Sequence, residues 1–317
     1  MTETRNDPAA RAPIRLALVG IGKIARDQHV PALRANPAYD LTATASRSGS
    51  VEGVPAFYDI DALVTQGPKL DAVSLCTPAA GRHAIAAAAI RAGLHVMLEK
   101  PPTTTLAEVA DLARLAKDAG VTLFTTWHSR AAPGVAPARA WLAERRIDAV
   151  RIVWKEDIRR WHPGQEWILG TGGFGVFDPG INALSIVTAI LPQPVLLRAA
   201  TMDVPEGRAS PIAATLTGQS GTAPVTADFD FLQTGPQSWD IEVDTDAGCL
   251  HLAMGGSQLT LPGEEPRADA EAEYPTLYAR FAELVAGGLS DVDATPLQLV
   301  ADAYLIAERR TVAPFAF

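Results

Sequence analysis

A glycine-rich turn near the start of the chain restricts its fold more than any other feature of the sequence. The apolar run Ile14–Val19 ends at Gly20, and Gly22 and Ala25 follow at the spacing of a turn that opens a helix. The first glycine permits the tight turn, the second lets the backbone approach a pyrophosphate, and a small third residue lets helix and strand pack closely. The amide groups at the helix start then face the phosphates. This segment predicts a dinucleotide-binding strand–turn–helix unit.

The remainder of the first half alternates short apolar runs with segments of helical periodicity, as in a parallel sheet wrapped by helices. Pro31 should break or kink the first helix, because proline removes a donor from a helix interior. We expect strands at residues 14–19, 41–46, 72–76, 95–99 and 122–126, and helices at residues 23–35, 82–92 and 106–119. The prediction is a Rossmann-type, doubly wound α/β domain over residues 13–127, preceded by a flexible tail over residues 1–12.

The second half has a different rhythm, with strand-like segments separated by turn residues. Val225, Ala227, Phe229 and Phe231 alternate with polar residues, so they should share one face of a strand. We expect strands at residues 149–157, 195–204, 212–218, 224–232, 238–245, 249–253 and 258–261, and helices at residues 175–191, 276–286 and 296–309. This pattern predicts an α+β domain over residues 128–317 with a large, mostly antiparallel sheet.

Composition excludes several classes of protein. The formal net charge of -9 disfavours a nucleic-acid partner, because such binding depends on neutralising phosphates. No segment is long and apolar enough to span a bilayer, and no secretory signal is visible, so we expect a cytoplasmic enzyme. Cys76 and Cys249 lie far apart in the sequence, which argues against a disulfide framework. The six histidines are scattered, so no metal site is predicted.

The end of the second predicted strand bears on the choice of cofactor. Many dinucleotide-binding domains carry an acid there that binds the adenosine ribose, whereas this chain has Ser46 and Arg47. A carboxylate would repel a 2′-phosphate, but an arginine can pair with it and a serine can donate to it. We therefore expect NADP, with additional use of NAD left open. The alternative is that Arg47 is an ordinary solvated loop residue.

Two further motifs make a family resemblance visible. Cys76-Thr77-Pro78 is followed by His83 and an alanine-rich helix, and Glu99-Lys100-Pro101 follows the next strand. With the glycine turn, these segments resemble the glucose–fructose oxidoreductase/inositol dehydrogenase/rhizopine-catabolism family of NAD(P)-dependent enzymes, over essentially the whole chain. The cofactor site that we expect from these segments comprises Gly20, Gly22, Lys23, Ile24, Ser46, Arg47, Cys76, Thr77, Pro78, His83, Glu99 and Lys100.

Other segments, at residues 127–130, 154–157, 160–165 and 177–185, are similar to family members that oxidise L-arabinose or D-galactose at the anomeric carbon. The resemblance implies a free aldose as substrate and a lactone as product. The active-site residues that it implies are Lys100, Glu156, His162, Asp178 and Asn182.

The chemistry of anomeric oxidation requires a hydride acceptor and a base for the hydroxyl proton. Asp178 and Asn182 stand at i and i+4 of a predicted helix, so both side chains should meet on one face. Many relatives have a histidine where Asn182 stands, and an asparagine cannot ionise. We therefore assign Asp178 as general base and Lys100 as the cation that orients the anomeric oxygen. The alternative makes Lys100 the base, and an acid early in a helix also has a purely structural reading.

The sugar itself should contact residues outside this pair. We expect Glu156 to accept hydrogen bonds from sugar hydroxyls and His162 to contact the substrate. Trp161 and Trp239 can present flat faces to sugar C–H bonds, although core packing is the plainer reading of a tryptophan. His128 is a further candidate.

Two other functions remain open on the sequence alone. The chain can be an oxidoreductase acting on another sugar, a cyclitol or a diol, or an NAD(P)-binding regulator without turnover. The resemblance also implies a homodimer through the open face of the second sheet. Phe229 and Phe231 would permit such an interface, and they would equally permit packing under the C-terminal helices.

Overall fold

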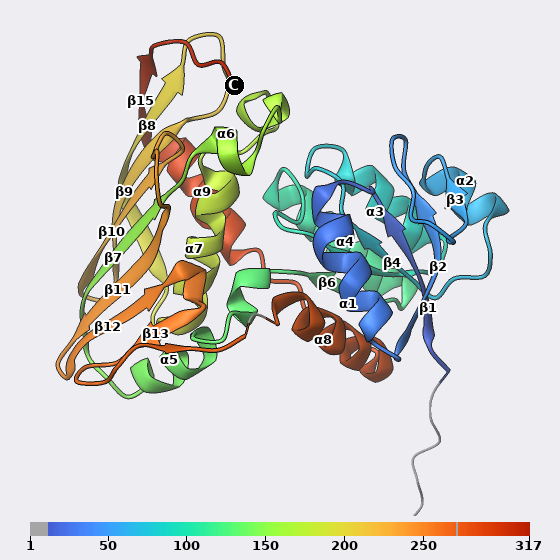
Figure 1. The fold of residues 1–317 in the computed structure, drawn as a ribbon, viewed down its shortest axis with the longest axis horizontal. Coiled ribbons are helices and arrows are strands. Elements are labelled where there is room, and N and C mark those ends of the chain that lie inside the picture. Colours follow the sequence, from blue (N-terminus) through green and yellow to red (C-terminus); the bar gives the residue numbers. More distant parts are fainter. Residues whose placement is uncertain (1–11, 271) are drawn as a thin grey trace, which may run out of the picture.

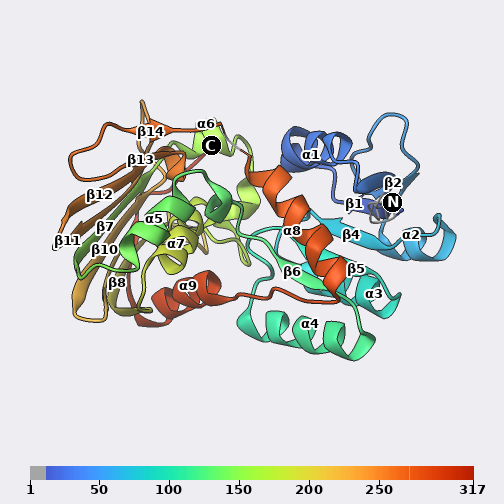
Figure 2. The ribbon, with the colours of Figure 1, turned by 90° about the horizontal axis from the view of Figure 1, so that it is seen from below.

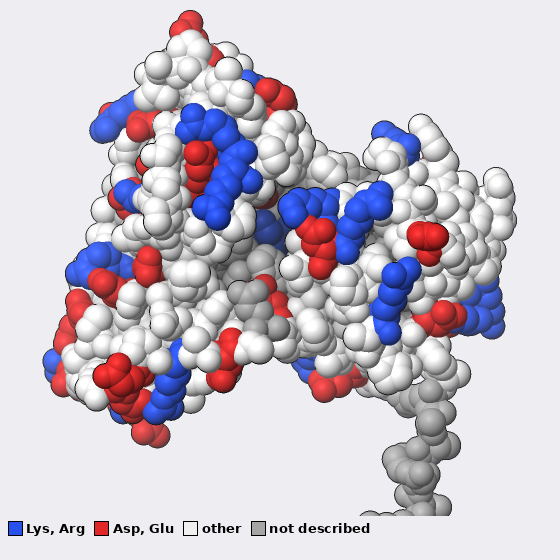
Figure 3. All heavy atoms as spheres, viewed as in Figure 1, with Lys and Arg blue, Asp and Glu red and all other residues white. Residues whose placement is uncertain are grey.

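The computed structural model describes residues 12–270 and 272–317, so the tail predicted for residues 1–12 lies outside the described residues except for Ala12. Two lobes stand side by side, and each is built on one sheet (Figure 1). In the space-filling view basic and acidic side chains are interspersed over the face shown, and a notch separates the lobes (Figure 3).

The first lobe contains a parallel sheet with the strand order β3-β2-β1-β4-β5-β6. The Rossmann-type, doubly wound arrangement predicted from the sequence is confirmed. The ends of the predicted strands differ from the observed ends by at most two residues. Only the short β3 and the helix after it were not predicted. The strands are β1 (Ile14–Val19), β2 (Tyr39–Ala45), β3 (Ala56–Phe57), β4 (Ala72–Leu75), β5 (His95–Leu98) and β6 (Leu123–Thr125).

Helices cover both faces of this sheet because successive strand residues point to opposite sides. Ala17 and Val19 pack toward α2 (Ile60–Gln66), α3 (Arg82–Arg91) and α4 (Leu106–Ala119). Leu16 and Leu18 pack on the other side, toward α1 (Val30–Ala35) and α8 (Glu273–Gly287). The amphipathic helix α8 lies in sequence between β14 and β15 of the second sheet, yet it lies across the first sheet (Figure 2).

The first helix is interrupted near Pro31, as predicted. A π-helical stretch, Ala25–His29, precedes α1, which has the proline in its first turn. Proline has no N–H to bond to the preceding turn, so a wider turn ahead of it is accommodated. This wide turn carries His29, whose side chain is fully buried.

The second lobe contains a sheet with the order β14-β13-β12-β11-β7-β10-β9-β8-β15, in which only β7·β10 and β8·β15 pair in parallel within the described residues. The predicted mostly antiparallel sheet is confirmed. Its strands are β7 (Ile147–Lys155), β8 (Val195–Pro205), β9 (Ala213–Ser220), β10 (Ala223–Asp230), β11 (Ser238–Thr245), β12 (Gly248–Ala253), β13 (Gln258–Thr260), β14 (Arg267–Ala268) and β15 (Ala307–Val312).

One face of this sheet is covered by α5 (Val135–Leu142), α7 (Phe177–Ile190) and α9 (Thr295–Ile306) (Figure 1). Phe229 and Phe231 are fully buried on this helical side, and the ring of Phe229 lies 5.7 Å from that of Phe177. They therefore pack under helices, and the open face is charged instead. There Arg151 pairs with Glu242, and Lys155 pairs with Asp228.

The end of the chain departs from expectation. The helix predicted for residues 296–309 ends at Ile306, and β15 begins at Ala307 and pairs in parallel with β8. The prediction was wrong over its last three residues because pairing at the sheet edge overrides local helix propensity. The exposed pair Arg310 and Glu308 gives this edge strand a charged character that suits solvent.

Candidate active site

The glycine turn lies at the carboxyl ends of the first sheet's strands, where such sheets bind their ligands. Gly20 has a φ of 90°, and a Cβ added there would stand 2.8 Å from both Cγ2 and the backbone nitrogen of Thr77. Only glycine permits this close approach. A Cβ on Gly22 would meet open space, so the backbone there is accessible to a ligand. The turn thus has the shape that a pyrophosphate requires.

The loop after β2 folds back onto this turn. The hydroxyl of Ser46 accepts hydrogen bonds from the amides of Ile21 (3.3 Å) and Ser48 (3.4 Å). A Cβ on Gly49 would stand 2.5 Å from the carbonyl oxygen of Ile21, so the loop and the turn are in contact. The side chain of Arg47 is exposed next to them.

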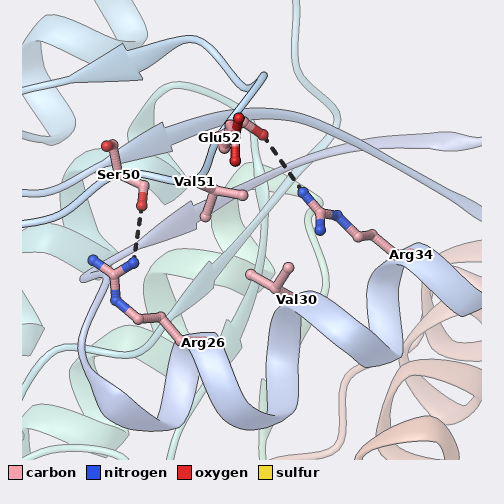
Figure 4. A pocket seen from close by; sticks show the side chains of 6 residues that line it. All are labelled: Arg26, Val30, Arg34, Ser50, Val51 and Glu52. Carbon is pink, nitrogen blue, oxygen red and sulfur yellow. Dashed lines mark hydrogen bonds between the residues drawn. The ribbon is translucent and has the colours of Figure 1, made fainter.

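Arg26 is a residue at this loop that the sequence reasoning missed. It donates to the carbonyl of Ser50 (3.2 Å), and Arg34 donates to that of Glu52 (3.5 Å). Both arginines line a hollow of about 360 Å³ between α1 and the loop (Figure 4). None of the predicted catalytic side chains borders this hollow. We therefore interpret Arg26 and Arg34 as residues that hold the loop in place.

The predicted catalytic residues Lys100 and Asp178 meet between the lobes. Lys100 follows β5 of the first lobe, whereas Asp178 lies in the first turn of α7 in the second. The Lys100 Nζ donates to the main-chain oxygen of Asp178 at 2.9 Å and lies 3.5 Å from its Oδ2. Asn182 stands one turn further along α7, and its buried Oδ1 has no hydrogen-bond partner in the described structure. This group of a cation, a carboxylate and a free amide oxygen can hold and deprotonate a hydroxyl group.

The predicted sugar contacts form a second cluster just beyond β7. Glu156 is 3% exposed, and its two oxygens contact His162 Nε2 at 3.2 Å and Trp239 Nε1 at 2.9 Å. Trp161 lies against Trp239 with ring centroids 5.0 Å apart. Trp154, which the sequence reasoning did not select, stacks on the other side of Trp239 at 5.9 Å. A buried carboxylate beside tryptophan faces is the arrangement by which proteins contact sugar hydroxyls and C–H bonds.

Two of the predicted histidines each contact an acidic side chain. The Nδ1 of His128 lies 2.7 Å from Glu273, at the start of α8, and its ring stacks on Tyr274. The Nε2 of His83 lies 2.9 Å from Asp111 and so links α3 to α4. The His128 ring therefore lies outside both the Lys100–Asp178 pair and the Glu156 cluster, and the cofactor contact predicted for His83 stays a prediction.

Glu99 lies at the centre of a buried polar network. Its Oε1 contacts His29 Nε2 at 3.0 Å and accepts from the Tyr274 hydroxyl at 2.7 Å, while Oε2 accepts from the Lys100 amide at 2.8 Å. Burial alone would raise the pKa of Glu99, but the hydrogen bond and charge of His29 hold that pKa well below its ordinary value. Burial by itself lowers the pKa of His29. Charge interactions with Cys76 and then with Tyr278 outweigh burial and raise that pKa well above its ordinary value. The pair is therefore ionic.

Residues 12–270 and 272–317 contain no cluster of three or more His, Cys, Asp or Glu side chains placed to hold a metal ion. Over the same ranges, no helix has both the length and the apolar character needed to cross a membrane.

Comparison with known proteins connects this geometry to a family. Residues 14–127 match the model of an oxidoreductase family with an NAD-binding Rossmann fold. The galactose 1-dehydrogenase of Pseudomonas fluorescens is 44% identical over 305 residues, which cover 96% of this chain and 99% of that protein. The D-xylose 1-dehydrogenase (NADP(+)) 2 of Haloferax volcanii is 31% identical over 82% of this chain and 80% of its own length.

A solved structure agrees with these sequence matches. The crystal structure of a D-galactose-1-dehydrogenase protein from Rhizobium etli superimposes with a TM-score of 0.93 at 51% identity, covering 97% of this chain and 99% of that one. The family resemblance and the NAD(P)-binding Rossmann domain predicted from the sequence are both confirmed. The chain belongs to the oxidoreductase family with an NAD-binding Rossmann fold that includes glucose–fructose oxidoreductase and inositol dehydrogenase.

Proposed function

We propose that this protein is an NADP-linked aldose 1-dehydrogenase that oxidises D-galactose, L-arabinose or both at the anomeric carbon to give the lactone. The observation that carries the proposal is the contact of Lys100, which follows the carboxyl end of β5, with Asp178 of the second lobe. Two relatives that match nearly the full chain, at 44% and 51% identity, are named for galactose 1-dehydrogenase activity.

The cofactor fits the residues present. The open backbone at Gly22 and the close approach at Gly20 form the cradle for a pyrophosphate. When bound, the nicotinamide accepts the hydride from the anomeric carbon. Arg47 and Ser46 favour a 2′-phosphate over a free ribose hydroxyl, which supports NADP, and the Haloferax relative is named for NADP. We keep NAD as a second cofactor in the proposal.

Side chains of the protein bind the anomeric hydroxyl and accept its proton. Lys100 Nζ donates to the Asp178 carbonyl, and we infer that another of its N–H groups donates to the anomeric oxygen when sugar binds. The Asp178 carboxylate then accepts the hydroxyl proton as general base. The unpartnered Oδ1 of Asn182 accepts from a neighbouring sugar hydroxyl, which satisfies a buried acceptor. The competing assignment, with Lys100 as the base, uses the same contact.

Sugar recognition falls to the Glu156 cluster. Glu156 is held by His162 and Trp239, so its remaining lone pairs point in set directions toward a ligand. Trp239 and Trp161 offer ring faces to the sugar's C–H groups. We keep His128, which pairs with Glu273 rather than with this cluster, as a further candidate sugar contact.

The proposal also includes a cytoplasmic location and a homodimer. The dimer would use the open face of the second sheet, against which nothing in the described chain packs (Figure 2). Light scattering during gel filtration, at low and high salt, distinguishes a dimer from a monomer.

The activity is tested by following NADPH formation with purified protein, NADP and D-galactose, L-arabinose, D-xylose, D-glucose and myo-inositol. Rapid turnover of the first two supports the proposal. Turnover of inositol or a diol instead would show a related oxidoreductase. Tight NADP binding without turnover of any compound would favour a regulator.

A further inference from the structure

Arg82 occupies an unusual position for an arginine. It is the first residue of α3 and is 2% exposed. The start of a helix carries a partial positive charge, so a cation there is disfavoured, and burial adds to this penalty. Burial lowers the pKa of Arg82 to about 10 against the opposing charge of Glu99. In the described residues no carboxylate side chain forms an ion pair with it; its printed hydrogen bonds all go to main-chain carbonyls.

Those carbonyls come from two segments. One edge of the guanidinium donates to the oxygen of Thr77, just after β4, with Nε at 3.0 Å. The Nη1 donates to the oxygens of Glu99 and Pro101, and it lies 3.5 Å from that of Pro102. Arg82 therefore bridges the loop that faces the glycine turn and the segment that carries Lys100.

The main chain around Lys100 is held on every side. Arg82 binds the carbonyls of Glu99 and Pro101, which flank the lysine, and the Glu99 carboxylate binds the lysine's amide at 2.8 Å. The side chain of Lys100 then extends to Asp178 in the other lobe. A displacement of about 1 Å at a reacting group can lower a rate about 100-fold.

We propose that Arg82 is a positioning residue that fixes the Lys100 main chain relative to Thr77, and hence sets the lysine amine against both cofactor and sugar. It acts through Lys100 and touches neither ligand. The inference rests on the proposed function only in assigning Lys100 to the substrate. The bridge itself is a property of the fold.

The test compares Arg82→Met with a matched variant, Arg91→Met, at the exposed end of the same helix. For Arg82→Met we expect kcat with galactose to fall about 100-fold while KM for galactose stays near the wild-type value. Arg91→Met should match the wild type in both. Where Arg82→Met does not fold, Arg82→Lys takes its place, since it keeps the cation but lacks the fork that reaches both segments.

A second readout is independent of turnover. The chain has five lysines, so reductive methylation with ¹³C-formaldehyde gives few NMR signals, and Lys100→Arg identifies the one from Lys100. The Lys100 signal should move in the folded Arg82 variant and stay in place in Arg91→Met. A folded Arg82 variant with an unmoved Lys100 signal overturns the inference, and so does one with wild-type kcat. Absence of sugar oxidation in the wild type would refute the proposed function, and the NMR comparison would still decide the role of Arg82.

Discussion

Two features of its surroundings favour a carboxylate at Asp178. It is in the first turn of α7, where the helix dipole favours a carboxylate, and it lies beside Lys100. Asp178→Asn keeps the size of the side chain and removes the base, so we expect kcat to fall by about 10²- to 10⁴-fold with cofactor binding retained. Steady-state kinetics and NADPH fluorescence titration measure the two effects.

Asp61→Asn is the matched control, because Asp61 is also a first-turn acid but lies on the exposed start of α2. It should leave kcat unchanged. If Asp178→Asn turned over at nearly the wild-type rate, the base would have to be Lys100.

The exposed Arg47 gives a separate prediction on cofactor choice. A hydrogen bond to a charged group contributes about 1.5–3 kcal/mol, so Arg47→Ala should lower kcat/KM for NADP by roughly 10- to 100-fold. The value for NAD should hardly change, because NAD has no 2′-phosphate. Arg34→Ala, which removes only the contact to Glu52, serves as control. Equal losses with both cofactors would argue against Arg47 as a phosphate ligand.

At the scale of elements, the buried pair of His29 and Glu99 joins the first helix to the end of β5, and Tyr274 adds α8. Because the pKa of His29 is higher in the folded than in the unfolded chain, protonated His29 stabilises the fold. This contribution is complete below about pH 6.5 and is lost as the pH rises through the pKa of His29 in the folded state. The pKa of Glu99 is lower in the folded than in the unfolded chain, so ionised Glu99 also stabilises the fold. This contribution is complete above about pH 4.3 and is lost as the pH falls through the pKa of Glu99 in the folded state. The pair therefore contributes most between about pH 4.3 and 6.5.

His29→Gln leaves a buried carboxylate unpaired, so we expect a loss of about 3–5 kcal/mol in unfolding free energy at pH 6. The difference from wild type should shrink as the pH rises through the folded pKa of His29. Urea unfolding across pH 6–10 measures both. The double variant His29→Gln/Glu99→Gln should recover part of the loss, because it removes both charges. His251→Gln, at a half-exposed pair with Asp240, should lose no more than about 1 kcal/mol. A loss at His29 that does not vary with pH would contradict the ionic pair.

The sequence predicted those elements whose signal is local. The glycine turn, the strands of the first sheet and the i, i+4 pair of Asp178 and Asn182 each depend on residues a few positions apart. The destination of α8 was not predictable, since an amphipathic pattern does not say which sheet a helix covers. The role of Arg82 was not predictable for a related reason. Its partners are main-chain carbonyls of distant loops, and every residue type has such a carbonyl.

At the scale of the whole molecule, the first lobe depends on the last part of the chain. Its core includes Tyr274, Leu277, Tyr278, Phe281 and Leu284 of α8. Burial of such side chains contributes about 1.5–3 kcal/mol each, so their sum is on the order of 10 kcal/mol. That is comparable with the entire stability of a typical domain, about 5–15 kcal/mol.

A fragment of residues 12–127 should therefore fail to unfold cooperatively and should bind hydrophobic dyes. The same fragment joined by a flexible linker to residues 272–290 should regain a cooperative transition. Circular dichroism during heating and dye fluorescence check both outcomes, and a linker-matched fusion with the α8 leucines and aromatic residues changed to serine is the control. A well-folded 12–127 fragment would show that α8 only covers a core that is already stable.

The position of α8 also determines the order of events during synthesis. A ribosome completes all six strands of the first sheet by residue 125, but the helix that covers one of its faces begins only at Glu273. The nascent sheet must therefore wait through the translation of almost the entire second lobe with the part of one apolar face that α1 does not cover left open. The first lobe is therefore completed only after most of the second has been synthesised, and the growing chain presents an apolar surface to chaperones throughout that interval.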